Sequence, residues 1–254
     1  MSTRTWRLAA LEFEILWEQF GRDRLPYPLQ YRSPIESAVD YQRQRRAAAQ
    51  GLQTYLDETL HRAVATIADT SLWVAAYGLD NLGQPGESVV RVNAGVSGGL
   101  ATIAVQEPGP AEDIGGDIVL TAAPAAQLPD LLAAALPSRE PGRQRGFSVQ
   151  EAELRRGEGD RFLADVKISP ARERVSRFLN RPRISAGEVV AAPGVAVDAR
   201  ANRDMRGFQW ADFAGDGRYL TRRTDTLTIE PATRTTVADW FTTLIASIDG
   251  TRRR

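Results

Sequence analysis

The sequence contains no cysteine and only one histidine, and these shortages narrow what the protein can do. Without cysteine there is no disulfide, no thiolate nucleophile, no iron–sulfur cluster and no cysteine zinc site. Because His61 is the single histidine, a metal site or a catalytic triad would have at most one imidazole. Most familiar catalytic chemistry is therefore excluded, and the residues favour a protein that binds over one that catalyses.

The sequence also has no net charge, since it contains 32 basic and 32 acidic residues. The single lysine is Lys167, so the other 31 basic residues are arginines, a skew typical of codon bias in a GC-rich genome. A balanced charge argues against a generic polyanion binder, and acidic residues lie close to the arginine pairs 45–46, 155–156 and 222–223. We expect no nucleic-acid partner.

Long apolar runs are absent as well. The most apolar stretches, 72–79 and 131–136, are far shorter than the roughly 18 to 20 residues that span a bilayer. The first apolar stretch carries Glu12, Glu14 and Glu18, which a signal peptide would not. We therefore expect a cytoplasmic protein without membrane insertion. Its 254 residues are enough to bury a substantial core unaided.

Hydrophobic periodicity predicts helices and strands in alternating blocks. Helices are predicted over 33–50, 54–68, 124–136, 170–180 and 231–248, the first with Ser33 as N-cap and Pro34 at its first position. Strands are predicted over 72–79, 89–94, 100–106, 117–121, 184–192, 195–199, 207–213, 218–222 and 226–230. The arginine-, glutamate- and glycine-rich stretch 138–159 is predicted to be a mobile linker.

Residues 11–20 fit two structures. Leu11, Phe13, Ile15 and Trp17 alternate with polar residues, as in a strand with one buried face. The spacing of Phe13, Trp17 and Phe20 fits an amphipathic helix equally well. Periodicity alone leaves the two alternatives open.

An internal repeat relates the two halves of the chain. Aligned without gaps, DIVLTAAPAAQLPDLLAAAL (117–136) matches the apolar pattern of TLTIEPATRTTVADWFTTLI (226–245), with Ile118 on Leu227 and Leu132 on Phe241. Apolar coincidence between two strand–helix units is common, but each half also reads as helix, strands and closing helix. We expect a single domain of residues 1–254 with pseudo-symmetric halves 1–137 and 146–250, a linker at 138–145 and a disordered basic tail at 251–254.

Three short motifs have an ordinary structural explanation. The glycine-rich stretch 95–99 lacks a phosphate-loop lysine and a following helix, so it predicts a hairpin turn. Glu112, Asp113 and Asp117 fit no calcium-loop spacing and indicate a solvated turn, so no metal site is expected. His61 follows Asp57 by four residues on a predicted helix, where a surface pair is the simplest interpretation.

Two segments resemble the EspG family, cytosolic chaperones of the ESX (type VII) secretion systems of actinobacteria. WRLAALEFEILWEQFGRDRLPYPLQ resembles the family's opening strand, tryptophan-bearing helix and Gly-x-x-x-(Leu/Phe)-Pro-(Tyr/Trp) turn, matched by Gly21, Leu25, Pro26 and Tyr27. DFAGDGRYL resembles its Asp-x-x-x-Gly-Arg-(Tyr/Ile)-Leu hairpin, carried by Asp212, Gly217, Arg218, Tyr219 and Leu220 with one additional residue after the aspartate. The order of elements matches along nearly the whole chain.

The resemblance implies a quasi-two-fold α/β (α+β) fold with a central, largely antiparallel sheet and two helical bundles. It implies a strand near 5–8 and a helix from Ala10 onward. It further implies a non-enzyme without cofactors, monomeric or weakly dimeric. Such a chaperone binds the hydrophobic helical tip of a PPE-type protein in a PE–PPE heterodimer, keeps it soluble and targets it for secretion. The runner-up functions are an adaptor for a WXG100-type substrate or secretion component, and an arginine-using enzyme acting on a phosphorylated metabolite.

The resemblance also implies where a partner would bind. The loop 80–88, between the second and third strands, is expected to be mobile until bound. We assign candidate contacts to this loop, to the C-terminal bundle and to one sheet strand, namely Asn81, Leu82, Gln84, Pro85, Glu87, Arg177, Phe178, Phe208 and Trp210. Ordinary core positions for Phe178, Phe208 and Trp210, and a plain hairpin turn for the loop, remain the alternatives.

Overall fold

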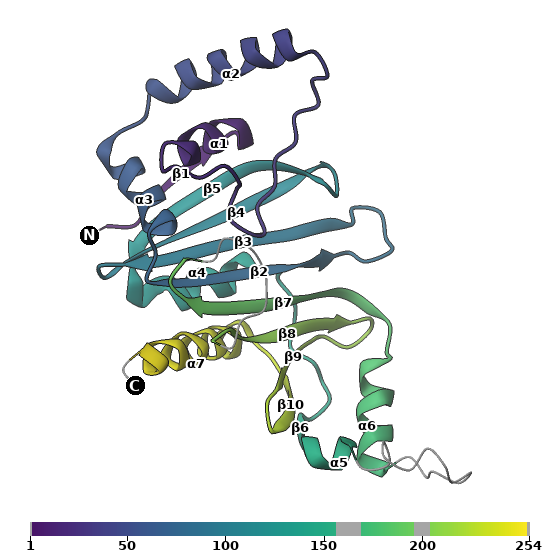
Figure 1. The fold of residues 1–254 in the computed structure, drawn as a ribbon. Helices are drawn as coiled ribbons and strands as arrows, with labels where there is room; N and C mark the ends of the chain where they lie inside the picture. The colour runs from purple at the N-terminus through teal and green to yellow at the C-terminus, as the bar shows by residue number, and fades with distance from the viewer. Residues whose placement is uncertain (1, 156–168, 196–203, 253–254) are drawn as a thin grey trace.

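The computed structural model describes residues 2–155, 169–195 and 204–252, and within them the chain forms one antiparallel sheet. Ten strands lie in the order β1-β5-β4-β3-β2-β7-β8-β9-β10-β6 (Figure 1). Their bounds are β1 (Arg4–Leu8), β2 (Leu72–Asp80), β3 (Ser88–Ser97), β4 (Leu100–Ala111), β5 (Ile114–Pro124), β6 (Phe147–Gln150), β7 (Arg183–Pro193), β8 (Arg206–Phe213), β9 (Arg218–Arg223) and β10 (Thr226–Pro231).

The described residues also contain seven α-helices. They are α1 (Ala10–Glu18), α2 (Ala38–Gln53), α3 (Glu58–Ala68), α4 (Leu128–Ala135), α5 (Glu151–Arg155), α6 (Pro170–Leu179) and α7 (Arg234–Arg252), with a 3-10 turn η1 (Ala125–Gln127) before α4. α4 and α7 pack together on one face of the sheet, whereas α1 and α3 cover the other face of the first half (Figure 1). The fold is therefore α+β, as predicted.

The two halves of the sheet have the same strand order. Read from the centre outward, β2, β3, β4, β5 and β1 on one side correspond to β7, β8, β9, β10 and β6 on the other. β2 and β7 pair antiparallel at the middle, which is the arrangement of a two-fold axis. β5 with α4 and β10 with α7 are the segments that the repeat aligns. The quasi-two-fold architecture predicted from the repeat is confirmed.

Alternation along the central strands sends side chains to two different cores. Val74 of β2, Val189 of β7 and Phe208 of β8 face α4 and α7 in the largest hydrophobic cluster. In the first half the other face packs under α1 and α3, through Phe13, Leu16, Leu60, Val64, Ile118 and Leu120. Where both faces of a strand are buried, as in residues 72–76 of β2, the sequence is a nearly continuous apolar run rather than a clean alternation.

The N-terminal segment resolves as a strand and a helix. β1 pairs with β5, with Trp6 opposite Leu120, and α1 follows from Ala10. The helix buries Phe13 and Trp17, whose rings stack with centroids 5.9 Å apart. Glu12 closes the helix start by accepting a hydrogen bond from the Ala9 backbone nitrogen at 2.8 Å. The helical alternative is thus correct for residues 10–18.

Several helix starts were predicted too early. α2 begins at Ala38 rather than Ser33, because the Ser33 hydroxyl accepts a bond from the Ile35 nitrogen and forms a local turn. α3 begins at Glu58 rather than Thr54, because the Thr54 hydroxyl instead closes α2 by donating to the Gly51 carbonyl. Local side-chain bonds of this kind decide helix ends, and periodicity does not register them.

The two C-terminal helices of the halves also begin later than predicted. Pro124 ends β5 and η1 precedes α4, so the predicted start at 124 is four residues early. Pro231 ends β10, and Thr233 accepts a hydrogen bond from the Thr236 nitrogen at the start of α7. α7 extends through Arg252, so the predicted tail 251–254 begins inside a helix. Residues 253–254 lie outside the described residues, as does most of the predicted strand 195–199.

The prediction of a mobile linker over 138–159 is wrong for its ordered part. β6 pairs with β10 at the edge of the sheet, and α5 follows it. Residues 138–145, the linker segment, are held by backbone bonds: the Gly142 nitrogen donates to the Arg218 carbonyl, and the Arg218 nitrogen donates to the Glu140 carbonyl at 2.8 Å. These bonds join residues that are far apart in the sequence, so the charged, glycine-bearing composition of the segment does not predict them. Residues 156–159 lie outside the described residues.

Two glycines make room for one tryptophan at the centre of the sheet. A Cβ at Gly187 would lie 2.1 Å from the Trp210 ring, and one at Gly78 would lie 2.6 Å from it. The Trp210 indole nitrogen donates to the Ser185 hydroxyl at 3.2 Å. The large ring thus occupies space that only glycine leaves on the neighbouring strands.

Substituting Gly187→Ala should therefore destabilise the fold. Overpacking of this kind costs roughly 1–3 kcal/mol, so we expect urea unfolding to give a free energy of unfolding lower by about 2 kcal/mol. Gly51→Ala is the matched control, because its nearest neighbour lies at 3.4 Å and Gly51 lies within α2. The control should gain roughly 0.5–1 kcal/mol. Equal stability of the two variants would contradict the packing argument.

Candidate partner-binding site

The β2–β3 loop, residues 81–87, has an internal hydrogen-bond network. Asn81 adopts a positive φ of 54°, and its amide donates to the Gly86 carbonyl at 3.2 Å. The Gly83 nitrogen donates to the Glu87 carboxylate at 2.6 Å. The Leu82 nitrogen donates to the Ile184 carbonyl at 2.9 Å, which joins the loop to the start of β7. A loop expected to be mobile thus has a defined conformation.

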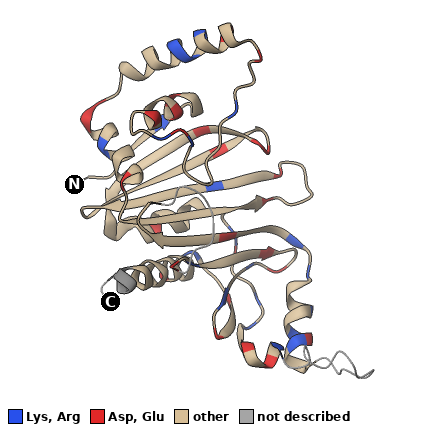
Figure 2. Cartoon of the chain, viewed as in Figure 1, with Lys and Arg blue, Asp and Glu red and all other residues tan. Residues whose placement is uncertain are grey.

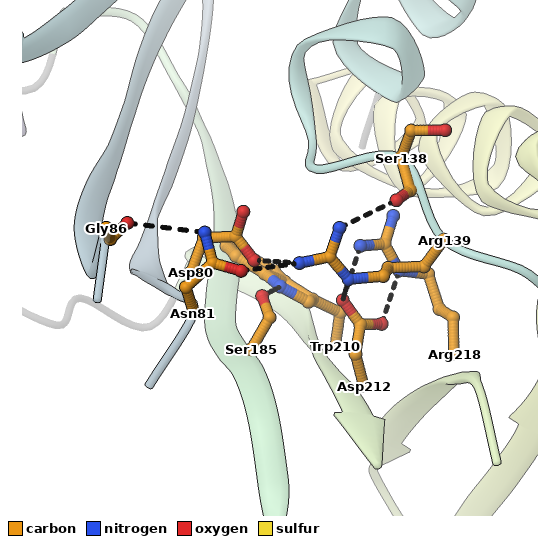
Figure 3. Close-up of polar contacts among 9 residues, drawn as sticks. All are labelled: Asp80, Asn81, Gly86, Ser138, Arg139, Ser185, Trp210, Asp212 and Arg218. Atoms are coloured by element: carbon orange, nitrogen blue, oxygen red, sulfur yellow. Dashed lines mark hydrogen bonds and ion pairs between the residues drawn. The ribbon is translucent and has the colours of Figure 1, made fainter. Parts of the chain in front are cut away.

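Arg139 of the linker segment anchors the base of this loop (Figure 3). Its guanidinium donates to the Asp80 carboxylate at 2.6 Å and to the Asn81 side-chain oxygen at 3.3 Å. A further bond to the Ser138 carbonyl at 2.9 Å fixes the arginine against its own segment. The loop of the first half is therefore tied to the segment that joins the halves.

A buried ion pair lies next to Arg139. Asp212 and Arg218 are 0% and 4% exposed, and two parallel hydrogen bonds of 2.7 Å join them. The Arg139 Nε lies 3.9 Å from the same Asp212 carboxylate. Figure 3 shows Arg139 and Arg218 on the same side of Asp212, so one buried carboxylate faces two guanidinium groups. Bidentate geometry makes this a strong, orientation-specific contact.

The rest of the β8–β9 hairpin holds the linker segment by its backbone. The Tyr219 hydroxyl accepts from the Gln144 nitrogen at 2.7 Å and donates to the Asp216 carboxylate at 2.9 Å. The other Asp216 oxygen accepts from the Arg143 nitrogen at 2.6 Å. Gly217 is required for this approach, because a Cβ there would lie 2.5 Å from the Pro141 carbonyl oxygen. Residues 212–219 of the β8–β9 hairpin therefore form a structural clamp on the linker segment.

Charge around Asp216 is set by the same contacts. Partial burial alone would raise its pKa, but hydrogen bonds from the Arg143 nitrogen, from Arg181 at 2.6 Å and from Tyr219 hold the pKa of Asp216 below its usual range. Burial, followed by the bond to this carboxylate, raises the pKa of Tyr219. Both groups thus keep their ordinary charge states at neutral pH, and the clamp stays intact there.

An uncovered strip of sheet lies beside the loop and the clamp. On the face opposite α4 and α7, Trp73, Ala75 and Ala192 are buried in a small cluster, whereas the side chains farther along the middle strands are exposed or half-buried. We call this strip the central sheet face, and it consists of Tyr77, Glu188, Val190, Gln209, Ala211 and Thr221. It mixes apolar and polar groups, as non-obligate protein interfaces do.

Two candidate contacts lie on the opposite face. Phe208 is 4% exposed and packs edge-on against Trp240 and Phe241 of α7. Trp210 is 1% exposed in the same core. The core alternative thus describes both residues, and the candidate surface does not include them. The residues on the other side of the same strand, Gln209 and Ala211, are the ones that sequence reasoning missed.

The other candidates lie where a partner could reach them or close to that surface. In the loop, Gln84, Pro85 and Glu87 are exposed, while Asn81 and Leu82 are half-buried. On α6, Arg177 is exposed and Phe178 is buried among Phe147, Phe213 and Tyr219. The bond from Leu82 to Ile184 brings the loop to the junction of α6 and β7, so these two groups share one end of the sheet.

The three short motifs of the sequence analysis have structural roles, one as the predicted turn and two through contacts with other side chains. Gly98 and Gly99, both at positive φ, form the β3–β4 turn. Asp57 caps α3 through the Leu60 nitrogen and pairs with Arg4, while His61 packs on the Phe20 ring, so the predicted Asp57–His61 pair is wrong. Arg32 pairs with Asp113, and Arg7 pairs with Asp117.

In the described part of the chain, no group of three or more histidine, aspartate and glutamate side chains could hold a metal ion. In the same residues, no helix has both the length and the apolar character needed to cross a membrane.

Comparison with known proteins identifies the fold. The model of the EspG family matches residues 9–242. The Mycobacterium tuberculosis type VII secretion system chaperone EspG5, solved in complex with a PE25–PPE41 dimer, aligns with a TM-score of 0.59 at 15% identity over 96% of this chain and 97% of that one. A putative oleoyl thioesterase from Lactobacillus plantarum aligns with a TM-score of only 0.13, at 10% identity over 91% and 95% of the two chains. Comparison with curated protein sequences gives no match.

Breaking the buried pair should destabilise the protein strongly. Asp212→Ala leaves the Arg218 guanidinium buried without its carboxylate, and we expect urea unfolding to show a loss of about 3–5 kcal/mol. The double variant Asp212→Ala/Arg218→Met removes both charges and should recover part of that loss. A double variant that is no more stable than the single one would show that the uncompensated charge is not the cause.

Removing the loop anchor should loosen the loop without unfolding the protein. Arg139→Ala deletes the bonds to Asp80 and Asn81, so backbone amides in 81–87 should exchange hydrogen several-fold faster in mass spectrometry. Arg43→Ala on α2, whose exposed ion pair with Asp40 contributes little, is the control. Unchanged exchange in the loop of the Arg139 variant would disprove the anchoring role.

Proposed function

This chain belongs to the EspG family, and we propose that it is a cytosolic specificity chaperone of a type VII secretion system. In this proposal it is not an enzyme and needs no cofactor. It binds the apolar helical tip of a PPE-type protein paired with a PE protein, prevents that tip from aggregating, and delivers the pair for secretion. The observation that carries the proposal is the family match over residues 9–242, supported by a fold like that of EspG5.

The geometry offers a surface suited to such a tip. The β2–β3 loop and the central sheet face provide half-buried apolar groups, Leu82 and Val190 among them, beside exposed polar ones. An apolar helical tip covers such a surface through hydrophobic contact, and the polar rim supplies orientation. Because Arg139 already anchors the loop, the loop loses less conformational entropy when a partner binds.

The domain organisation in this proposal is one domain with two functional parts. The halves 1–137 and 146–250 share one sheet, so they act as a single body, and the clamp of the β8–β9 hairpin on 138–145 fixes their connection. The partner then meets elements of both halves, the loop from the first and α6 with β8 from the second. We propose that the chaperone acts as a monomer or weak dimer.

Co-expression tests the function directly. With a PE–PPE pair from the same genome, the full chain should co-elute from a size-exclusion column as a complex with both proteins. Failure with every such pair would disprove the proposal, and selective capture of a WXG100-type protein would replace it with the adaptor function. Pro85→Glu, exposed in the loop, and Leu82→Glu should abolish co-elution, because a carboxylate cannot be desolvated against an apolar tip.

Val39→Glu is the matched control for these variants. Val39 is an apolar residue on α2 that is 71% exposed, away from the loop and the central sheet face. Its variant should co-elute as the unmodified chain does. Thermal melting of all three variants separates loss of binding from loss of folding, since Pro85→Glu changes an exposed side chain only.

A further inference from the structure

A cavity lined by four arginines lies at the far end of the second half. It has a volume of about 340 Å³ and is bounded by α6 and the segment that leads into β6. Figure 2 shows basic segments on α6. We call it the arginine pocket, and its lining includes Arg145, Arg174, Arg177 and Arg181 together with Phe147 and Phe178. Four cations around one small cavity are unexpected in a chain with zero net charge.

Aromatic rings contact two of the four arginines, Arg174 and Arg181. The Arg174 guanidinium lies 4.0 Å from the centre of the Phe147 ring, and that of Arg181 lies 4.1 Å from the Phe178 ring. Arg181 also pairs with Asp216 at 2.6 Å. Among residues 2–155, 169–195 and 204–252, neither Arg145 nor Arg177 has an ion-pair partner, and both are exposed. The pocket therefore presents positive charge that this part of the chain does not neutralise.

The pseudo-two-fold symmetry allows the surroundings of equivalent arginines in the two halves to be compared. Trp6 of β1 lies opposite Leu120, and Phe147 of β6 lies opposite Ile229, which the repeat aligns with Leu120. Arg4 and Arg145 precede these two aromatic residues at the same distance along the chain, so they are counterparts. In the first half Arg4 pairs at 2.8 Å with Asp57, the N-cap of α3.

Within the described part of the second half, no acid stands at the corresponding helix start. α6 precedes β7 as α3 precedes β2, and its N-cap is Ser169 rather than an aspartate. Ser169 caps its helix through the Arg172 nitrogen just as Asp57 caps α3, but it brings no carboxylate to the counterpart arginine. The second half thus has the counterpart arginine, but a neutral serine stands at the N-cap of the corresponding helix.

We propose that a short acidic segment of a protein partner supplies the missing carboxylates in the arginine pocket. Guanidinium groups bind carboxylates with two parallel hydrogen bonds, and the Phe147 and Phe178 rings provide apolar contact for the side chains between the acids. The cavity accommodates a few side chains and is far smaller than the extended basic surface that a nucleic acid or a membrane requires.

The pocket continues the surface of the proposed function and extends it. Arg181 lies three residues before Ile184, whose carbonyl holds the β2–β3 loop. A partner whose apolar tip covers the loop and the central sheet face can therefore place acidic residues flanking that tip over α6. This inference rests on the proposed function for the identity of the partner, but the chemistry of the pocket can be tested without it.

A peptide arm tests the pocket by itself. A short fluorescein-labelled peptide that alternates glutamate with leucine is titrated into the full chain, and the same peptide with glutamine in place of glutamate is the reference. The acidic peptide should bind about tenfold more tightly, and the preference should shrink as salt is raised. Arg145→Glu/Arg177→Glu should abolish the preference. Arg46→Glu/Arg234→Glu, which reverses two exposed arginines outside the pocket, should retain it.

A second arm uses the co-eluting PE–PPE dimer and the same two double variants. Arg145→Glu/Arg177→Glu should weaken its affinity about tenfold and reduce its salt dependence, whereas the control should bind as the unmodified chain does. If the dimer binds the unmodified chain but both variants behave alike in both arms, the pocket proposal fails and the proposed function stands.

Other results separate the two proposals further. If no dimer binds while the peptide preference appears and follows Arg145 and Arg177, the proposed function fails and the pocket stands. Equal binding of the acidic and neutral peptides overturns the pocket. Sedimentation with phosphatidylserine vesicles that depends on Arg145 and Arg177, without any peptide preference, would assign the pocket to a membrane surface instead.

Discussion

The buried ion pair between Asp212 and Arg218 holds together the part of the molecule on which the candidate site depends. Taking both charges out of water is costly, and the cost is offset only by good geometry and further bonds. Here the carboxylate accepts two bonds from one arginine and faces a second, Arg139. The backbone of Arg218 in turn binds both sides of the linker segment. One desolvated carboxylate thus fixes the join between the halves and, through Arg139, the base of the β2–β3 loop.

The two halves repeat one arrangement of strands. The candidate binding surfaces lie where the halves differ. Both halves contribute five strands in corresponding order, and β2 and β7 close the sheet at its centre. The first half covers its face with α1 and α3, while the second leaves Gln209 and Ala211 of β8 accessible. Among the residues that the structure describes, the acid that neutralises Arg4 in the first half has no counterpart beside Arg145. The halves thus share the fold but differ in uncovered surface and unpaired charge.

Sequence reasoning located most strands and the duplication, because β-branched runs between glycine turns depend on local composition. It misplaced helix starts, where one hydroxyl decides the end, as Ser33 and Thr54 do. It called 138–159 a mobile linker because the bonds that order 138–145 run to Arg218 and Tyr219, far away in the sequence. Phe208 and Trp210 could not be assigned to a face, since a period of two separates the faces without naming them, and only the position of α7 decides. The accessible residues of that strand are polar or small, so no apolar pattern in the sequence identifies them.

Balanced composition conceals an unbalanced distribution of charge. In the first half, Arg4, Arg7 and Arg32 each pair with a carboxylate, so that part of the sheet presents neutralised charge. In the second half the clamp uses Asp212 and Asp216 internally, and both are largely buried in bonds to arginines and backbone nitrogens. Acids engaged in this way contribute to the zero total, but of the four arginines of the arginine pocket they pair only with Arg181. Net charge therefore argues against a generic polyanion surface, but it does not exclude a local cationic site, because a sum over the chain contains no information on which charges are paired.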